Sequence, residues 1–80
     1  MTKIHRPLHV IANEIYKDWG SKIYFGAKPY LLAMSQLSDM DEHYGMDSAD
    51  SIVRYFLTNA SSWRGEKARE IKKELNVMLK

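Results

Sequence analysis

The sequence predicts an all-α protein, with one domain over residues 1–80 folded as a single bundle of three to four short helices. Three observations carry this prediction. Apolar residues recur at three- and four-residue spacing in four separate stretches. Prolines, glycines and helix-capping residues stand between these stretches. No stretch alternates apolar and polar residues over a useful length, as a strand in a sheet would.

The first predicted helix spans residues 7–19. Pro7 fits the first turn, where its missing N–H is not needed, and Gly20 stands at the expected C-terminal position. The apolar side of this stretch consists of Leu8, Ile11, Ala12, Ile15 and Trp19.

Residues 20–27 connect the first helix to the second and contain Ile23, Tyr24 and Phe25 in a row. Three large apolar side chains in a short connection predict a loop that docks onto the core. A short strand is the alternative, but no partner strand is evident.

The second predicted helix, residues 28–38, has Pro29 at its start. The third, residues 48–61, follows a polar connection in which Gly45 indicates a turn. We expect Asp47 to cap the third helix, with Asp50 in its first turn. The inner stripes are Tyr30, Ala33, Met34 and Leu37 with Leu31 flanking, and then Ile52, Val53, Phe56, Leu57 and Ala60.

The last predicted helix spans residues 64–79, with Ser61 or Ser62 as its cap and Gly65 permitting the turn. Trp63 follows Phe56 by seven residues, so it continues the inner stripe and is expected to fill the core at this corner. The apolar side is Ala68, Ile71, Leu75, Met78 and Leu79. Opposite it lie the predicted ion pairs Glu66–Arg69 and Glu70–Lys73.

Composition excludes several classes of protein. The chain has no cysteine, so disulfide scaffolds, thiolate zinc sites and cysteine nucleophiles are excluded. No apolar run approaches the roughly 18 residues of a membrane span, and no signal-peptide pattern follows the basic start MTKIHRPLHV. We therefore expect a cytoplasmic protein that does not bind a membrane.

Charge is distributed unevenly along the chain. Residues 1–30 carry five Lys/Arg against two Asp/Glu, residues 31–60 carry one against five, and residues 61–80 carry six against three. The simplest interpretation is that the basic ends fold back beside the acidic middle.

Two clusters resemble metal sites but lack essential ligands. His5 and His9 have the spacing of two ligands on one helix face, without an evident third. A calcium loop starting at Asp39 would need Gly and Glu where Tyr44 and Asp50 stand. We expect no metal and no cofactor.

No nucleophile elbow and no phosphate-cradling glycine loop is present, so the sequence predicts a non-enzymatic protein. The basic residues of the last helix could contact nucleic acid, but Glu66, Glu70 and Glu74 interleave with them and favour a salt-paired, solvated face.

Exposed tyrosine beside arginine is typical of protein-binding surfaces. The candidate surfaces are the acidic loop 39–50 with Tyr44 and Tyr55, or the corner around Arg64 before the last helix. Their candidate partner-binding residues are Asp41, Glu42, Tyr44, Arg54, Tyr55 and Arg64.

The stretches YFGAKPYLLAM and YGMDSADSIVRYFLTNASSWRGEKAREIKKEL resemble small all-helical conserved-hypothetical proteins encoded in tailed-phage genomes. The resemblance covers most of the chain. It implies a phage origin, a location in the host cytoplasm, and no catalytic residues. It also implies binding and modulation of a host protein, such as an enzyme or a defence component. A nucleic-acid-binding module and a self-associating structural component are the alternative functions.

Overall fold

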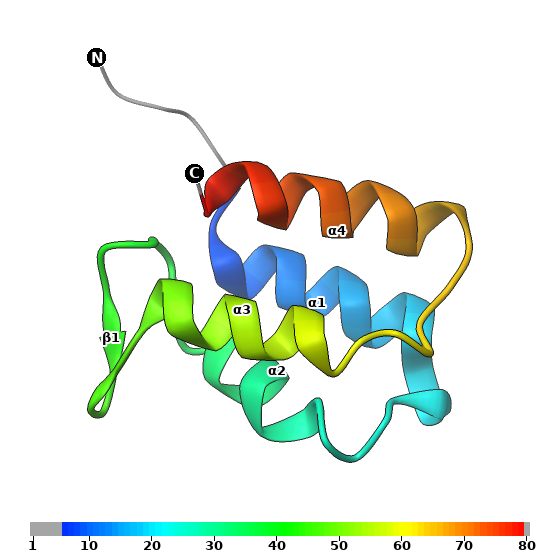
Figure 1. Ribbon diagram of the computed structural model, residues 1–80, viewed down its shortest axis with the longest axis horizontal. Helices are drawn as coiled ribbons and strands as arrows, with labels where there is room; N and C mark the ends of the chain where they lie inside the picture. The colour runs from blue at the N-terminus through cyan, green and yellow to red at the C-terminus, as the bar shows by residue number, and fades with distance from the viewer. Residues whose placement is uncertain (1–5, 80) are drawn as a thin grey trace.

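The computed structural model describes residues 6–79 as four α-helices and one short hairpin (Figure 1). The helices are α1 Leu8–Trp19, α2 Lys28–Met34, α3 Ala49–Thr58 and α4 Glu66–Met78, and a 3₁₀ turn, η1 Gly20–Lys22, follows α1. Strands β1 His43–Tyr44 and β2 Asp47–Ser48 pair antiparallel. The predicted helical bundle is confirmed, but the all-α class is wrong in its strict form because of this hairpin.

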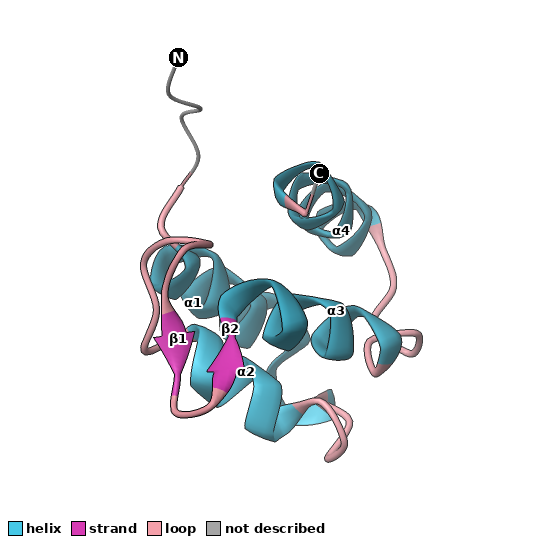
Figure 2. Ribbon diagram, turned by 60° about the vertical axis from the view of Figure 1, so that its left-hand side comes forward, coloured by secondary structure: helices cyan, strands magenta, loops and turns pink. Residues whose placement is uncertain are grey.

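Helix α1 is in the middle of the bundle. It contacts α2 on one side and α4 on the other, and α2 also packs against α3. Both ribbon views place α4 and α2 on opposite sides of α1 (Figures 1 and 2). The hairpin lies at one end of the long axis and the α3–α4 connection at the other (Figure 1).

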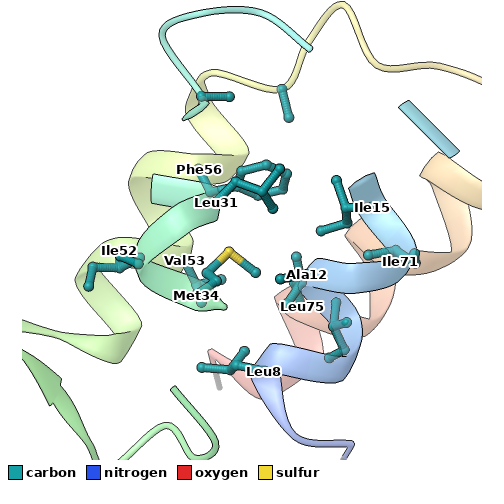
Figure 3. Packing of buried hydrophobic residues seen from close by; sticks show 14 of the residues in the cluster. Leu8, Ala12, Ile15, Leu31, Met34, Ile52, Val53, Phe56, Ile71 and Leu75 are labelled. Atoms are coloured by element: carbon teal, nitrogen blue, oxygen red, sulfur yellow. The ribbon is translucent and has the colours of Figure 1, made fainter. Parts of the chain in front are cut away.

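The core consists of the apolar stripes that the periodicity predicts. All five predicted residues of the first helix are buried, and so are the predicted residues Ala68, Ile71, Leu75 and Met78 of α4. In Figure 3, Leu31 and Met34 of α2 point into the same interior as Phe56 of α3 and Ile15 of α1. Burial of these side chains is the main term that stabilises the fold.

Helix α2 is shorter than predicted. It ends at Met34 rather than at residue 38. The chain then runs along the start of α1, where the carbonyls of Leu37 and Ser38 accept hydrogen bonds from the backbone amides of His9 and Leu8, at 2.8 and 3.1 Å. These bonds satisfy two of the free amides at a helix start, which Pro7 cannot cap with a side chain.

The cap of α3 is Ser48 and not Asp47. The Ser48 Oγ accepts a hydrogen bond from the amide of Ser51 at 3.3 Å and donates one to the Asp50 carboxylate at 2.7 Å. The second bond is the main reason why the pKa of Asp50 lies below its ordinary value. Asp47 instead pairs with Tyr44 across the hairpin.

The turn of the hairpin contains a glycine at the position that needs one. Gly45 has φ +63°, and it is the first residue of a two-residue loop, where a glycine with positive φ suits the twist of the flanking strands. Strands of two residues are too short to show any alternation of apolar and polar residues, so the sequence pattern could not reveal them.

Helix α4 begins at Glu66, and the serine cap predicted for it is wrong. Gly65 is the N-cap, and no side chain caps the helix. The Gly65 backbone has φ +113° with an extended ψ, a region that is essentially restricted to glycine. The turn therefore depends on Gly65, as predicted, and not on Ser61 or Ser62.

Three aromatic rings join α1, α3 and the α3–α4 connection. The Trp63 indole stacks on Trp19 with ring centroids 5.6 Å apart, and Phe56 meets both indoles edge-on at 6.3 and 6.4 Å. Trp63 is 2% exposed, and its Nε1 donates to the Asp18 carboxylate at 2.8 Å. The prediction that Trp63 fills the core is confirmed.

We expect Trp63→Ala to lower the free energy of unfolding by about 3–5 kcal/mol, because it leaves a cavity between Trp19 and Phe56. Urea denaturation measures this loss. Trp63→Phe is the matched control, since it keeps an aromatic ring and removes the bond to Asp18, and should cost clearly less. Equal stability of Trp63→Ala and the wild type would contradict the buried position.

A network of ion pairs joins the two ends of the described chain. Arg6 donates through Nε and Nη2 to the two carboxylate oxygens of Glu74, at 3.0 and 2.7 Å, and through Nη1 to Glu14. Lys67 lies 3.9 Å from Glu14. Among residues 6–79, these ion pairs join cations of the two basic segments to carboxylates of those same segments and not to the acidic middle.

The hydrogen bond from Arg6 holds the pKa of Glu14 below its ordinary value of 4.5. A lowered pKa in the folded state contributes stability above the unfolded pKa, and this contribution is lost as the pH falls through the folded value. Because these side chains are about one third exposed, solvent screens them, and we estimate the whole network at about 1 kcal/mol.

Arg6→Gln should therefore lower the free energy of unfolding by about 1 kcal/mol at neutral pH. The difference in this free energy between the variant and the wild type should become smaller as the pH falls below 4.5. Urea denaturation across this pH range checks both statements. Lys28→Gln, which removes an exposed charge far from the network, is the control. A gap that stays constant with pH would mean that Arg6 acts through packing alone.

Candidate functional site

The structure separates the six predicted partner-binding residues into three places. Asp41, Glu42 and Tyr44 lie at the hairpin end of the molecule, and Arg64 lies in the α3–α4 connection at the other end (Figure 1). The remaining two, Arg54 and Tyr55, lie on α3. All six side chains are exposed, but they do not form one surface.

The hairpin end uses part of its acidic charge to hold its own backbone. The Glu42 carboxylate accepts a hydrogen bond from the amide of Ser38 at 2.7 Å, and Asp39 accepts one from Met40 at 2.8 Å. The Glu42 carbonyl also accepts a bond from the amide of Ala49 at 2.9 Å, next to the start of α3. Glu42 therefore has a structural role, which weakens its assignment as a binding residue.

Three exposed aromatic residues, Tyr24, Phe25 and Tyr55, lie in the η1–α2 connection and on α3. Tyr30 of α2 is half-buried against the core and contacts the Tyr55 ring. We call these four residues the aromatic surface. The prediction that the loop docks on the core is correct for Ile23, which is partly buried against it. It is wrong for Tyr24 and Phe25, which are 44% and 75% exposed.

The turn before α2 explains this exposure. The amides of Ala27 and Lys28 donate to the carbonyls of Tyr24 and Phe25, at 2.9 and 3.3 Å. This turn places Ala27 in the core with no exposed surface, while the two preceding rings remain outside. The small residue, rather than the aromatic ones, anchors the connection.

Ring contacts join the aromatic surface into two pairs. Tyr24 and Phe25 have ring centroids 4.9 Å apart, and Tyr30 and Tyr55 have centroids 5.5 Å apart. Gly26 lies between the Tyr24 ring and Asn59, the C-cap residue of α3, because a Cβ on Gly26 would lie 2.5 Å from the Tyr24 ring and 3.0 Å from the side-chain oxygen of Asn59.

Asn59 extends the surface along α3. It follows Tyr55 by one helical turn and donates a side-chain hydrogen bond to the Tyr55 carbonyl at 2.9 Å. Arg54 borders the surface and lies 3.8 Å from Asp50 in an exposed ion pair. The result is a group of aromatic rings with a polar margin, the usual composition of a protein-binding patch.

Sequence reasoning found Tyr55 and missed Tyr24, Phe25 and Tyr30. It placed Tyr30 on the inner stripe of the second helix, with Leu31 beside it. Ala33, Met34 and Leu37 of that stripe are buried as predicted, and so is the flanking Leu31. Tyr30 is only partly buried at the edge of the core, which leaves its ring in contact with Tyr55.

The α3–α4 connection forms a second candidate site around Trp63 and Arg64. One open hollow there is lined by Asp18, Trp19, Lys22, Ser62, Trp63 and Arg64. A second, on the other side of Arg64, is lined by Trp63, Arg64, Gly65, Ala68, Arg69 and Lys72. We call the second one the basic hollow.

Two further sequence observations lead to no site in the described part of the chain. His5 lies outside the described residues, and His9 is exposed at the start of α1. Residues 6–79 contain no group of three or more His, Asp or Glu side chains that could hold a metal ion. Within the same residues, no helix combines the length and apolar character needed to cross a membrane.

Comparisons of the chain with protein-family models, curated proteins and solved structures found no match.

We expect Gly26→Ala to displace the Tyr24 ring, because the new Cβ would occupy its place. The loss in free energy of unfolding should stay at or below about 1 kcal/mol, since an exposed ring can move at low cost. Contacts between Tyr24 and Phe25 in nuclear Overhauser spectra would report the displacement, with Lys22→Ala, a change at an exposed residue before the same connection, as the control. An unmoved Tyr24 ring would contradict the close packing at Gly26.

Proposed function

We propose that this chain is a non-enzymatic accessory protein of phage type that binds a host protein through its aromatic surface. The observation that carries the proposal is the exposure of Phe25 and Tyr55, each in contact with a second aromatic ring. Buried aromatic rings are among the side chains that contribute most to binding free energy at protein interfaces.

The proposed binding mode resembles that of other protein interfaces with a few anchors. Phe25 would enter an apolar pocket of the partner, and Tyr55 would combine ring burial with a hydroxyl hydrogen bond. Arg54 lies at the margin of the surface, where a charge adds to the rate and specificity of association more than to affinity. This role keeps Tyr55 and Arg54 as proposed binding residues and adds Phe25.

The resemblance to phage-encoded proteins supports a bacterial host protein as the partner. A host enzyme or a component of host defence fits this proposal equally well. Self-association is the competing use of the same surface, because a second copy could also cover the exposed rings. Sedimentation over a range of concentrations separates a monomer from a self-associating protein.

The decisive experiment is affinity capture from bacterial lysate with quantitative mass spectrometry. We expect a variant with both Phe25→Ala and Tyr55→Ala to recover its specific partner at least about tenfold less than the wild type, as loss of two anchor residues would produce. Tyr16→Ala is the matched control, since Tyr16 is an exposed ring on α1 outside the aromatic surface.

The same assay tests the other two places predicted from the sequence. Tyr44→Ala probes the hairpin end, and Arg64→Ala probes the α3–α4 connection. If the double aromatic variant recovers the same proteins at wild-type level while one of these variants does not, the aromatic surface is the wrong site.

A further inference from the structure

The basic hollow combines three cations with no lining carboxylate. Arg64, Arg69 and Lys72 lie around an open volume of about 320 Å³ on the surface beside the first turns of α4. Among residues 6–79, the ion pairs closer than 4.0 Å include none of these three side chains. The hollow therefore concentrates positive charge that the described chain leaves without a counter-ion.

This arrangement corrects the prediction of a salt-paired face on the last helix. Glu66 and Glu70 interleave with Arg69 and Lys72 in the sequence. At three-residue spacing Arg69 neighbours both Glu66 and Lys72 on the helix. In the structure Arg69 lines the hollow together with Lys72, and neither glutamate lines it. The predicted pairs Glu66–Arg69 and Glu70–Lys73 are absent from the ion pairs of residues 6–79.

Lys72 is held in position at the hollow. Its Nζ donates to the Trp63 carbonyl at 2.7 Å and lies 5.9 Å from the centre of the indole ring. Burial, together with the nearby charge of Arg64, lowers the pKa of Lys72. The remaining N–H groups of this ammonium are available to a ligand, and an anion would relieve the repulsion between the two cations.

The backbone beside these cations is open. A Cβ on Gly65 would meet no atom within 4 Å, so a ligand can approach the chain there. The guanidinium groups of Arg64 and Arg69 can each present two parallel N–H groups to an oxyanion, while Lys72 supplies a point charge. A phosphate group, whose non-bridging oxygens accept several charge-assisted hydrogen bonds, suits such a set of donors.

We propose that the basic hollow binds a phosphate group, with Arg64, Arg69 and Lys72 as its charged donors. The phosphate can belong to a free phosphate ester or to the backbone of a nucleic acid, since both present anionic non-bridging oxygens that accept charge-assisted hydrogen bonds. This site shares no residue with the aromatic surface. Failure of the protein-binding proposal therefore leaves this one intact, and the reverse is also true.

The test is a titration of the isotope-labelled protein followed by amide and indole NMR signals. One arm adds inorganic phosphate or adenosine monophosphate, and the other adds a short DNA duplex. Sodium chloride at matched ionic strength is the blank in both arms. We expect saturable shifts confined to residues 63–72 and the Trp63 indole N–H.

Two single substitutions show whether the binding depends on Lys72 or on the charge of α4 in general. Lys72→Gln should weaken the binding about tenfold or more, as loss of a charge-assisted hydrogen bond would. Lys73→Gln makes the same change of charge on the next residue of α4, outside the hollow, and should leave the affinity within about twofold. Near-ultraviolet circular dichroism of the tryptophans confirms that both variants fold.

Each result decides the proposal. Saturable binding of free phosphate that Lys72→Gln weakens supports the site with a small ligand. Binding of the duplex alone, weakened by Lys72→Gln and by added salt, supports it with nucleic acid as the source of the phosphate. No saturable shift in either arm, or equal weakening by Lys72→Gln and Lys73→Gln, overturns it.

Discussion

The contact between the Trp63 indole and the Trp19 ring is the constraint on which the rest of the bundle depends. Trp63 belongs to an irregular connection, Trp19 ends α1, and Phe56 of α3 closes the cluster edge-on. These rings fix where α3 stops and where α4 starts. An 80-residue domain buries only about 60% of the surface of its unfolded chain. Three large rings at one junction are therefore a substantial share of its core.

The same contact also defines the basic hollow. Because the indole is buried, the Trp63 carbonyl has a fixed position, and Lys72 donates to it. The next residue, Arg64, is thereby directed to the surface beside Gly65. A core residue thus sets the positions of polar groups around it, and the proposed phosphate site is only as ordered as the aromatic cluster beneath it.

Periodicity was sufficient to predict the helices and most of the core. Residues such as Ile11, Ile15, Ile71 and Leu75 are buried because the 3.6-residue repeat of a helix places them on one face. The ends of the helices were harder to predict, since they depend on partners distant in sequence. Helix α2 ends early because the carbonyls that follow it bond to α1.

The candidate surfaces were predictable only in part. Tyr55 and Arg64 could be identified as exposed because they fall outside the helical stripes. Phe25 could not, because an apolar residue in a loop carries no periodicity that distinguishes a docked ring from an exposed one. Its exposure follows from the turn that buries Ala27 instead. The acidic loop 39–50 and the connection around Arg64 lie at opposite ends of the molecule. This could be seen only from the three-dimensional arrangement of the helices.

The bond between Arg6 and Glu74 spans 68 residues of the chain. Closing so large a loop costs more conformational entropy than forming the local contacts of α2 with its neighbours in sequence. Helix α4, whose main contacts are with α1, is therefore expected to join the bundle last during folding and to detach first when the native state opens locally. Such an opening would expose the apolar side of α4 and leave α1, α2 and α3 in contact with one another.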